Sequence, residues 1–130
     1  MVSPIQLFID KRIDKYYSLF CIKRSLSGSV YLAEALKLSF DDDRLLHQNI
    51  TTKLYPKIAQ KYEVSPSQVE KGIRHLITVC YNNDSLRANL VEFLNVGSEH
   101  LNSYYKPSNS ELISLCYWKL KIRLEEEGYL

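Results

Sequence analysis

The spacing of the apolar residues, which recur every three or four positions along almost the whole chain, most constrains how this sequence folds. That spacing puts apolar side chains on one face of an α-helix, whereas a half-buried strand requires strict alternation, for which no segment is convincing. The 4 Gly and 4 Pro are also too few for the frequent turns of a β-sandwich. The sequence therefore predicts an all-α fold, a compact bundle of about six or seven helices that contains a helix-turn-helix.

Two of the helix starts are marked by capping boxes, in which a Ser and a Gln or Glu three positions later satisfy free backbone N–H groups. These pairs are Ser65 with Gln68 and Ser108 with Glu111, and Pro66 suits the first position of its helix. The full prediction is helices at residues 10–22, 29–40, 55–62, 66–81, 86–94 and 109–124, a short helix at 45–46 capped by the acidic run 41–43, and an irregular segment at 97–107.

The length of 130 residues fits one domain, and the net charge of +2 identifies no class of partner by itself. Apolar runs are far shorter than the roughly 18–20 residues that cross a bilayer, and the N-terminus lacks the pattern of a secretory signal. The three cysteines, Cys21, Cys80 and Cys116, are an odd number without a C-x-x-C pair, which suits a reducing compartment. We expect a cytoplasmic protein with no membrane span.

Residues 55–74 have the pattern of a helix, a short turn and a second helix. Ala59 is small where the first helix must approach the second, and neighbouring apolar residues can fill the angle between them. The turn holds Glu63 where many helix-turn-helix motifs have Gly. Because any corner between two helices needs similar residues, this pattern alone leaves the function open.

The second helix of this pair divides into two faces at about 100° per residue. The apolar face comprises Val69, Ile73, Leu76, Ile77 and Cys80, and the opposite face comprises Ser67, Lys71, Arg74, His75 and Thr78, with Glu70 at the flank. A recognition helix in the major groove needs this division. Arg74 and Lys71 can donate to guanine O6 and N7, and Glu70 can accept from cytosine N4. The alternative is an ordinary solvated helix surface.

The charge of the chain is concentrated on this segment. Between residues 51 and 75, four Lys and one Arg face two Glu, a net charge of +3. Acidic residues at 41–43 and 125–127 hide this excess in the sum over the whole chain. A basic helix-turn-helix is what attraction to DNA phosphates requires, and we expect Lys53, Lys57 and Ser67 to contact phosphate.

Four segments occur in an order that resembles one known family. They are YLAEA at 31–35, LYPKIA at 54–59, VEKGIRH at 69–75 and KPSNSE at 106–111. They resemble the C-terminal effector domains of the stage zero sporulation protein A family, response regulators of sporulation in endospore-forming Firmicutes. The similarity covers about residues 26–124. It implies an all-helical domain that binds double-stranded DNA at TGTCGAA-like elements, often in tandem copies.

By this resemblance, Glu70, Lys71, Arg74 and His75 fall at the base-reading positions, and the segment from Lys106 to Asn109 lies near the DNA backbone. Two positions depart from the family: Lys71 stands where Arg is usual, and Gly72 where Ala is usual. Lysine lacks the planar fork of arginine, so discrimination at its base is expected to soften. Glycine costs up to about 1 kcal/mol of helix propensity.

Residues 26–130 are predicted to form the DNA-binding domain, and residues 1–25 an N-terminal extension with one helix packed on it. That extension is too short for the receiver domain of the family, so the chain is either a fragment or a stand-alone homologue, and a homodimer on DNA is possible in either case. The second hypothesis is a degenerate homologue that serves as a protein-interaction module. Because no catalytic, nucleotide-binding or metal-ligand spacing occurs in the sequence, we expect no enzyme, cofactor or metal site.

Overall fold

The computed structural model describes residues 3–19, 22–82 and 106–129. These residues form five α-helices and two short helical turns, and strands are absent from these three ranges. The elements are α1 (Pro4–Leu19), α2 (Ser27–Asp41), the 3-10 turn η1 (Asp43–Leu46), the π-helical turn η2 (Ile50–Leu54), α3 (Tyr55–Tyr62), α4 (Pro66–Tyr81) and α6 (Asn109–Glu126). The prediction of an all-α fold is confirmed. The helix predicted at 86–94, Cys21 and most of the segment 97–107 lie outside the described residues.

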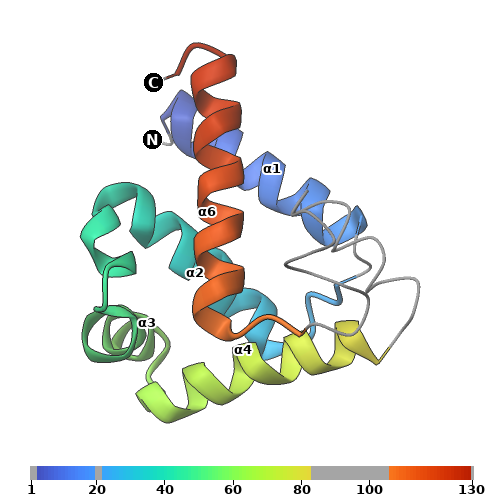
Figure 1. The fold of residues 1–130 in the computed structure, drawn as a ribbon, viewed down its shortest axis with the longest axis vertical. Helices are drawn as coiled ribbons and strands as arrows, with labels where there is room; N and C mark the ends of the chain where they lie inside the picture. The colour runs from blue at the N-terminus through green and yellow to red at the C-terminus, as the bar shows by residue number, and fades with distance from the viewer. Residues whose placement is uncertain (1–2, 20–21, 83–105, 130) are drawn as a thin grey trace.

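The long helix α6 runs across the front of α1 and α2, and α4 lies across the lower end of the molecule (Figure 1). α2 packs against α4 and α6, and α3 packs against α4. The N- and C-terminal ends of the chain lie close together at the opposite end from α4 (Figure 1), where the rings of Phe8 and Tyr129 are 5.1 Å apart between centroids. The helix predicted to read DNA thus lies far from both termini.

α1 begins at Pro4, six residues earlier than predicted. Ser3 explains the early start, because its side-chain oxygen accepts from the backbone N–H of Gln6 at 3.1 Å and proline suits the next position. Ile9, Ile13 and Tyr17 are buried in the common core, and the Tyr17 hydroxyl donates to the carbonyl of Ser29 in α2 at 2.6 Å. The division of the chain into an N-terminal extension, residues 1–25, and a DNA-binding domain, residues 26–130, stays a prediction.

α2 crosses α4 at a point where both helices carry glycine. A Cβ atom on Gly28 would overlap the carbonyl oxygen of Gly72, so this position in α2 excludes any larger residue. A Cβ atom on Gly72 would lie 3.0 Å from the ring of Tyr31, which is tight but not an overlap with backbone. Gly72, one of the two departures from the family pattern, therefore lies at the closest approach of α2 to α4.

The acidic run that joins α2 to η1 caps a helical turn through Asp42, as predicted, although the turn is of the 3-10 type and only four residues long. The Asp42 carboxylate accepts from the backbone N–H of Arg44 at 3.1 Å and from the Arg44 guanidinium at 2.9 Å. These hydrogen bonds from Arg44 lower the pKa of Asp42. The turn leads into η2 and so positions the start of α3.

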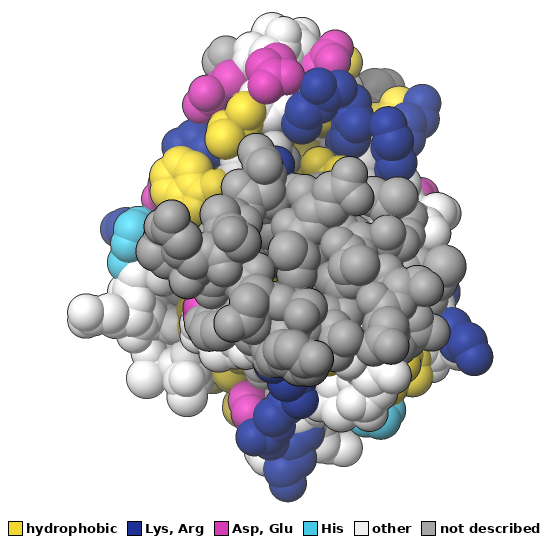
Figure 2. Space-filling view, turned by 45° about the vertical axis from the view of Figure 1, so that its right-hand side comes forward, with side chains coloured by type: hydrophobic (Ala, Val, Ile, Leu, Met, Phe, Trp, Pro, Cys, Tyr) yellow, Lys and Arg dark blue, Asp and Glu magenta, His cyan; other side chains and the backbone are white. Residues whose placement is uncertain are grey.

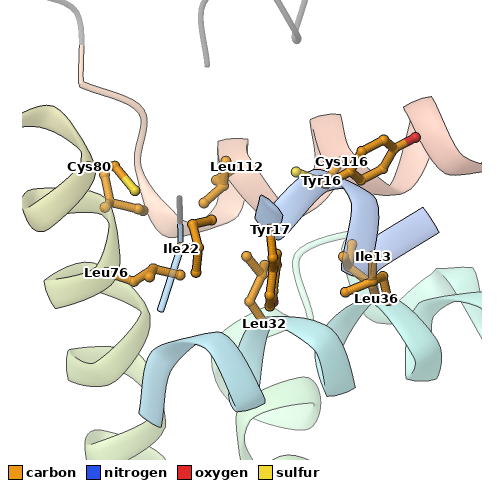
Figure 3. Close-up of a pocket in the computed structure, with 11 residues that line it drawn as sticks. Ile13, Tyr16, Tyr17, Ile22, Leu32, Leu36, Leu76, Cys80, Leu112 and Cys116 are labelled. Atoms are coloured by element: carbon orange, nitrogen blue, oxygen red, sulfur yellow. The ribbon is translucent and has the colours of Figure 1, made fainter. Parts of the chain in front are cut away.

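A small apolar cavity of about 30 Å³ lies between α1, α2, α4 and α6. Cys80 on α4 and Cys116 on α6 both line it, with Leu112 between them (Figure 3). Burial raises the pKa of the Cys116 thiol to about 12, so that the thiol stays protonated at neutral pH. These two cysteines are therefore core residues, as their positions on apolar stripes predict.

Candidate nucleic-acid interface

The predicted helix, turn and second helix correspond to α3, residues 63–65 and α4. α3 begins at Tyr55 and ends at Tyr62, as predicted, and continues directly from the π-helical turn η2. The sequence does not predict that turn. Pro56 has no backbone N–H to donate to residue 52, and the winding changes from π to α just before it.

The turn between the two helices is closed by Glu63, which adopts the left-handed conformation with φ 56° and ψ 45°. Its backbone N–H donates to the carbonyls of Ala59 and Gln60, and the N–H of Val64 donates to Ala59 at 3.0 Å. Glu63 thus takes up the backbone conformation for which other such motifs use glycine. The turn forms despite the missing glycine.

α4 starts with the predicted capping box. The Ser65 hydroxyl accepts from the N–H of Gln68 at 3.1 Å, and the Gln68 side chain accepts from the N–H of Ser65 at 2.8 Å. The helix then runs to Tyr81, as predicted. Its predicted apolar face is buried throughout and consists of Val69, Ile73, Leu76, Ile77 and Cys80. This burial fixes which face of α4 is turned toward solvent.

The candidate base-reading residues lie on the solvent side of α4. Lys71, Arg74 and His75 are exposed, and Glu70 is half-buried at the edge of that face. Glu70 and Arg74 lie one helical turn apart and form an ion pair of 3.1 Å, with side chains 35% and 56% exposed. The pair holds the Arg74 guanidinium over the middle of α4 while leaving more than half of the side chain accessible.

The candidate phosphate-contacting residues Lys53, Lys57 and Ser67 are also exposed, on η2, α3 and the first turn of α4 respectively. They therefore come from three consecutive elements. Lys61, which contributes to the predicted charge excess, instead pairs with the nearly buried Glu34 of α2 at 2.9 Å, and this hydrogen bond raises the pKa of Lys61. Sequence reasoning did not reveal that contact, because Glu34 and Lys61 are 27 positions apart.

The segment 106–109 reaches α4 from the other side. The ammonium group of Lys106 donates to the Thr78 hydroxyl at 2.6 Å. The side-chain amide of Asn109 donates to the Glu70 carbonyl at 2.9 Å and to the Tyr55 hydroxyl at 3.2 Å. Both residues predicted to lie near the DNA backbone are thus brought to α4, and both make hydrogen bonds within the protein.

Lys106 and Asn109 border a groove of about 390 Å³ along α4. Its walls are formed by Arg74 and Glu70, by the segment 106–110 and by Thr51 and Tyr55. Thr51, Tyr55 and Ser110 also line the groove and were not predicted as neighbours of the site. The second capping box offered a signal for Ser110, since it fixes the start of α6 at this point, and Tyr55 belongs to the segment 54–59 that resembles the family, whereas nothing in the sequence marks Thr51.

Basic side chains gather at two heights on the face drawn in Figure 2. One group lies at the bottom, at the height of α4 in Figure 1, and the other lies near the top, where acidic side chains lie beside it. The acidic residues of the C-terminal run, 125–127, are partly engaged by Arg123, which pairs with Glu126 and Glu127. Only the basic group at the height of α4 is thus separated from the acidic C-terminal run, as the sequence predicts for the helix-turn-helix, whereas the other group lies beside acidic side chains.

None of the helices in residues 3–19, 22–82 and 106–129 has the length and apolar character of a membrane span. Within the same ranges, no three His, Cys, Asp or Glu side chains come together as a group that could hold a metal ion.

The sequence matches the family described as "Sporulation initiation factor Spo0A C terminal" over residues 13–120. The match begins inside α1 and ends in α6, so it includes α2, α3 and α4 and every candidate residue named above. The family consists of DNA-binding regulatory domains of sporulation and is not a known enzyme family. The chain belongs to the family of Spo0A C-terminal domains and is a DNA-binding transcription regulator domain.

Proposed function

We propose that this protein recognises a specific double-stranded DNA element by inserting α4 into the major groove. The observation that carries the proposal is the division of α4, whose apolar face is fully buried while Lys71, Arg74 and His75 point to solvent from the opposite face. A helix held in this way offers polar side chains to base edges without disturbing the core. The family to which the chain belongs binds DNA. The exposed polar face of α4 is the part of the domain that we propose to contact base edges.

Each exposed side chain of α4 would contact a different group on the base edges. Arg74 is suited to the paired acceptors O6 and N7 of guanine, and Lys71 to either of them as a single charge. Glu70 can accept from a cytosine N4 amino group while it orients Arg74 through their ion pair. His75 lies one turn beyond Lys71 and would contact the next bases or the edge of the groove.

Phosphate contacts would come from both sides of α4. Lys53 and Lys57 lie on η2 and α3, Ser67 lies in the first turn of α4, and Lys106 lies near Thr78 toward the other end of α4. Each lysine that neutralises a phosphate releases counterions and so makes the affinity depend on salt. Asn109 was also predicted to contact phosphate, but both N–H groups of its amide have acceptors inside the protein.

The DNA element is proposed from the family resemblance, as a TGTCGAA-like sequence present singly or in tandem. Two copies of the protein would then bind side by side on tandem elements, as a homodimer formed on DNA. This activity would take place in the cytoplasm, with the chromosome. The competing hypothesis, a protein-interaction module that no longer reads DNA, predicts that no duplex is preferred.

The test is a comparison of binding to a duplex with the TGTCGAA-like core and to a scrambled duplex, across a salt series. The wild type should prefer the core by at least about a hundredfold, because specific binding usually exceeds non-specific binding by about 10³ or more. Arg74→Ala should cost about 1–3 kcal/mol on the core and little on the scrambled duplex. Lys57→Ala should weaken both duplexes alike and flatten the salt dependence.

Equal and negligible affinity of the wild type for both duplexes would contradict the proposal and favour the interaction module. A matching loss on both duplexes for Arg74→Ala would remove Arg74 from the base-reading residues. Lys37→Ala serves as the matched control, since Lys37 pairs with Asp10 at 3.0 Å and lies on α2, away from the proposed contacts.

A further inference from the structure

We infer that Asn109 is a positioning residue, which fixes α4 at the angle needed for specific reading instead of binding DNA phosphate. Its amide nitrogen lies 2.9 Å from the carbonyl oxygen of Glu70 and 3.2 Å from the hydroxyl of Tyr55. A side-chain amide has two N–H groups, and these two acceptors can use both. The inference rests on the proposed function, because it concerns how α4 is held for reading.

The three partners belong to three different helices. Asn109 is the first residue of α6, Tyr55 is the first residue of α3, and Glu70 lies one turn into α4. Tyr55 is buried, with only 4% of its surface exposed, so the packing of its side chain restricts where its hydroxyl can lie. The Asn109 amide therefore ties the beginnings of α3 and α6 to the candidate recognition helix.

One of the two residues that accept from Asn109 is Glu70, which also forms the ion pair with Arg74. Glu70 accepts from Asn109 through its backbone and holds Arg74 through its side chain, at 3.1 Å. A shift of α4 against α6 would move the Arg74 guanidinium, which must meet two acceptors on one guanine. Loss of Asn109 should therefore reduce discrimination between sequences more than it reduces general affinity.

Lys106 makes a second hydrogen bond from the segment 106–109 to α4, and unlike Asn109 it uses a charged group. Its ammonium group donates to Thr78 at 2.6 Å, eight residues after Glu70, which is about 12 Å along the helix axis. The segment 106–109 is thus fastened to α4 at both ends, with Arg74 between the two ties. Unlike Asn109, Lys106 carries a charge, so its loss should weaken binding to every duplex.

Asn109→Ala, Lys106→Ala and the control Asn49→Ala test the inference by their affinities for the core and scrambled duplexes. Asn49 is a matched control because its amide also donates to a backbone carbonyl, that of Arg44 at 2.9 Å, away from α4. Asn109→Ala should weaken binding to the core about tenfold and to the scrambled duplex less than twofold. Lys106→Ala should weaken both equally, and Asn49→Ala neither.

The double variant Asn109→Ala/Arg74→Ala shows whether Asn109 acts through Arg74. If it does, the double variant binds the core no more weakly than Arg74→Ala alone, because groups that act as a unit are not additive. Additive losses, or equal losses on both duplexes for Asn109→Ala, would overturn the inference. The capping box of Ser108 and Glu111 remains in every variant, and far-UV circular dichroism checks that the helices are retained.

Urea denaturation without DNA tests this inference independently of the proposed function. If the wild type shows no sequence preference, the proposed function fails, and the tie is still measurable by urea denaturation without DNA. Asn109→Ala and Tyr55→Phe should each lower the urea concentration at the midpoint of unfolding. The double variant Asn109→Ala/Tyr55→Phe should lower it by less than the sum of the two single effects. Strict additivity would show that the Asn109–Tyr55 contact does not hold the helices together.

Discussion

Glu63 forms the turn before α4 in a backbone conformation that is costly for its residue type. With φ 56° its Cβ approaches the following carbonyl oxygen, which costs roughly 1–2 kcal/mol for residues other than glycine. The hydrogen bonds from Glu63 and Val64 back to Ala59 hold the conformation in place. The turn is therefore kept by its helix-capping bonds, at a cost that a glycine would not incur.

Glu63→Gly should accordingly stabilise the protein by about 0.5–1 kcal/mol, since relief of strain exceeds the entropy that glycine gains in the unfolded chain. Urea denaturation monitored by circular dichroism measures the change in unfolding free energy. Glu63→Ala is the control, because it removes the same charge and keeps the Cβ. If Glu63→Gly is no more stable than Glu63→Ala, backbone strain at this turn is not significant.

Individual residues show where sequence reasoning succeeds and where it stops. The faces of α4 followed from periodicity alone, because a residue's side of a helix depends only on its position along that helix. The pairing of Lys61 with Glu34 and of Asn109 with Tyr55 did not, since these partners are 27 and 54 positions apart. Such contacts depend on how the helices pack, which spacing within one helix does not determine.

At the scale of elements, the starts of α4 and α6 were predicted correctly because each capping box is a local hydrogen-bond pattern written in four residues. The start of α1 was missed although the sequence offers the same signal there, since Gln6 stands three positions after Ser3 and Pro4 follows Ser3 directly. The π-helical turn η2 was missed because its winding depends on the chain on both sides of it. Prediction was thus best where one short pattern decides the structure.

The crossing of α2 and α4 yields a prediction about helix packing. Gly28→Ala should destabilise the protein by about 1–3 kcal/mol, because the new methyl group would overlap the Gly72 carbonyl and force the helices apart. Gly72→Ala should lie within about 1 kcal/mol of the wild type, since a gain in helix propensity offsets the tight contact with Tyr31.

Thermal or urea unfolding of the two alanine variants, each against the wild type, measures these effects. The prediction requires Gly28→Ala to be clearly less stable than Gly72→Ala, even though the substitution is the same and both sites are helical. Equal stabilities would show that α2 and α4 can separate at little cost. Gly72→Ala also tests whether restoring the usual family residue changes the specificity of α4.

Across the whole molecule, the distribution of charge carries more information than its sum. The net charge of +2 includes the acidic run 125–127, at the opposite end of the molecule from α4, and the run 41–43, where Lys53 of η2 is close enough to help lower the pKa of Asp42. The sequence predicted the separate position of the C-terminal run because charges cluster in short segments, but it did not predict that Asp42 lies near Lys53. It could not predict the groove beside α4, because that groove is built by Thr51, Tyr55, Arg74 and the segment 106–110, which come together only in the folded chain.

Base-analogue interference tests directly whether α4 reads guanines in the major groove. Each guanine of the TGTCGAA-like core is replaced in turn by 7-deazaguanine, which lacks the N7 acceptor and leaves base pairing intact. We predict that at one guanine this replacement weakens the wild type by roughly fivefold to tenfold and leaves Arg74→Ala unaffected, because the lost hydrogen bond is the one that Arg74 makes. If the wild type binds every substituted duplex as tightly as the natural core, α4 does not read guanine N7, and the proposed recognition of guanine by Arg74 is contradicted.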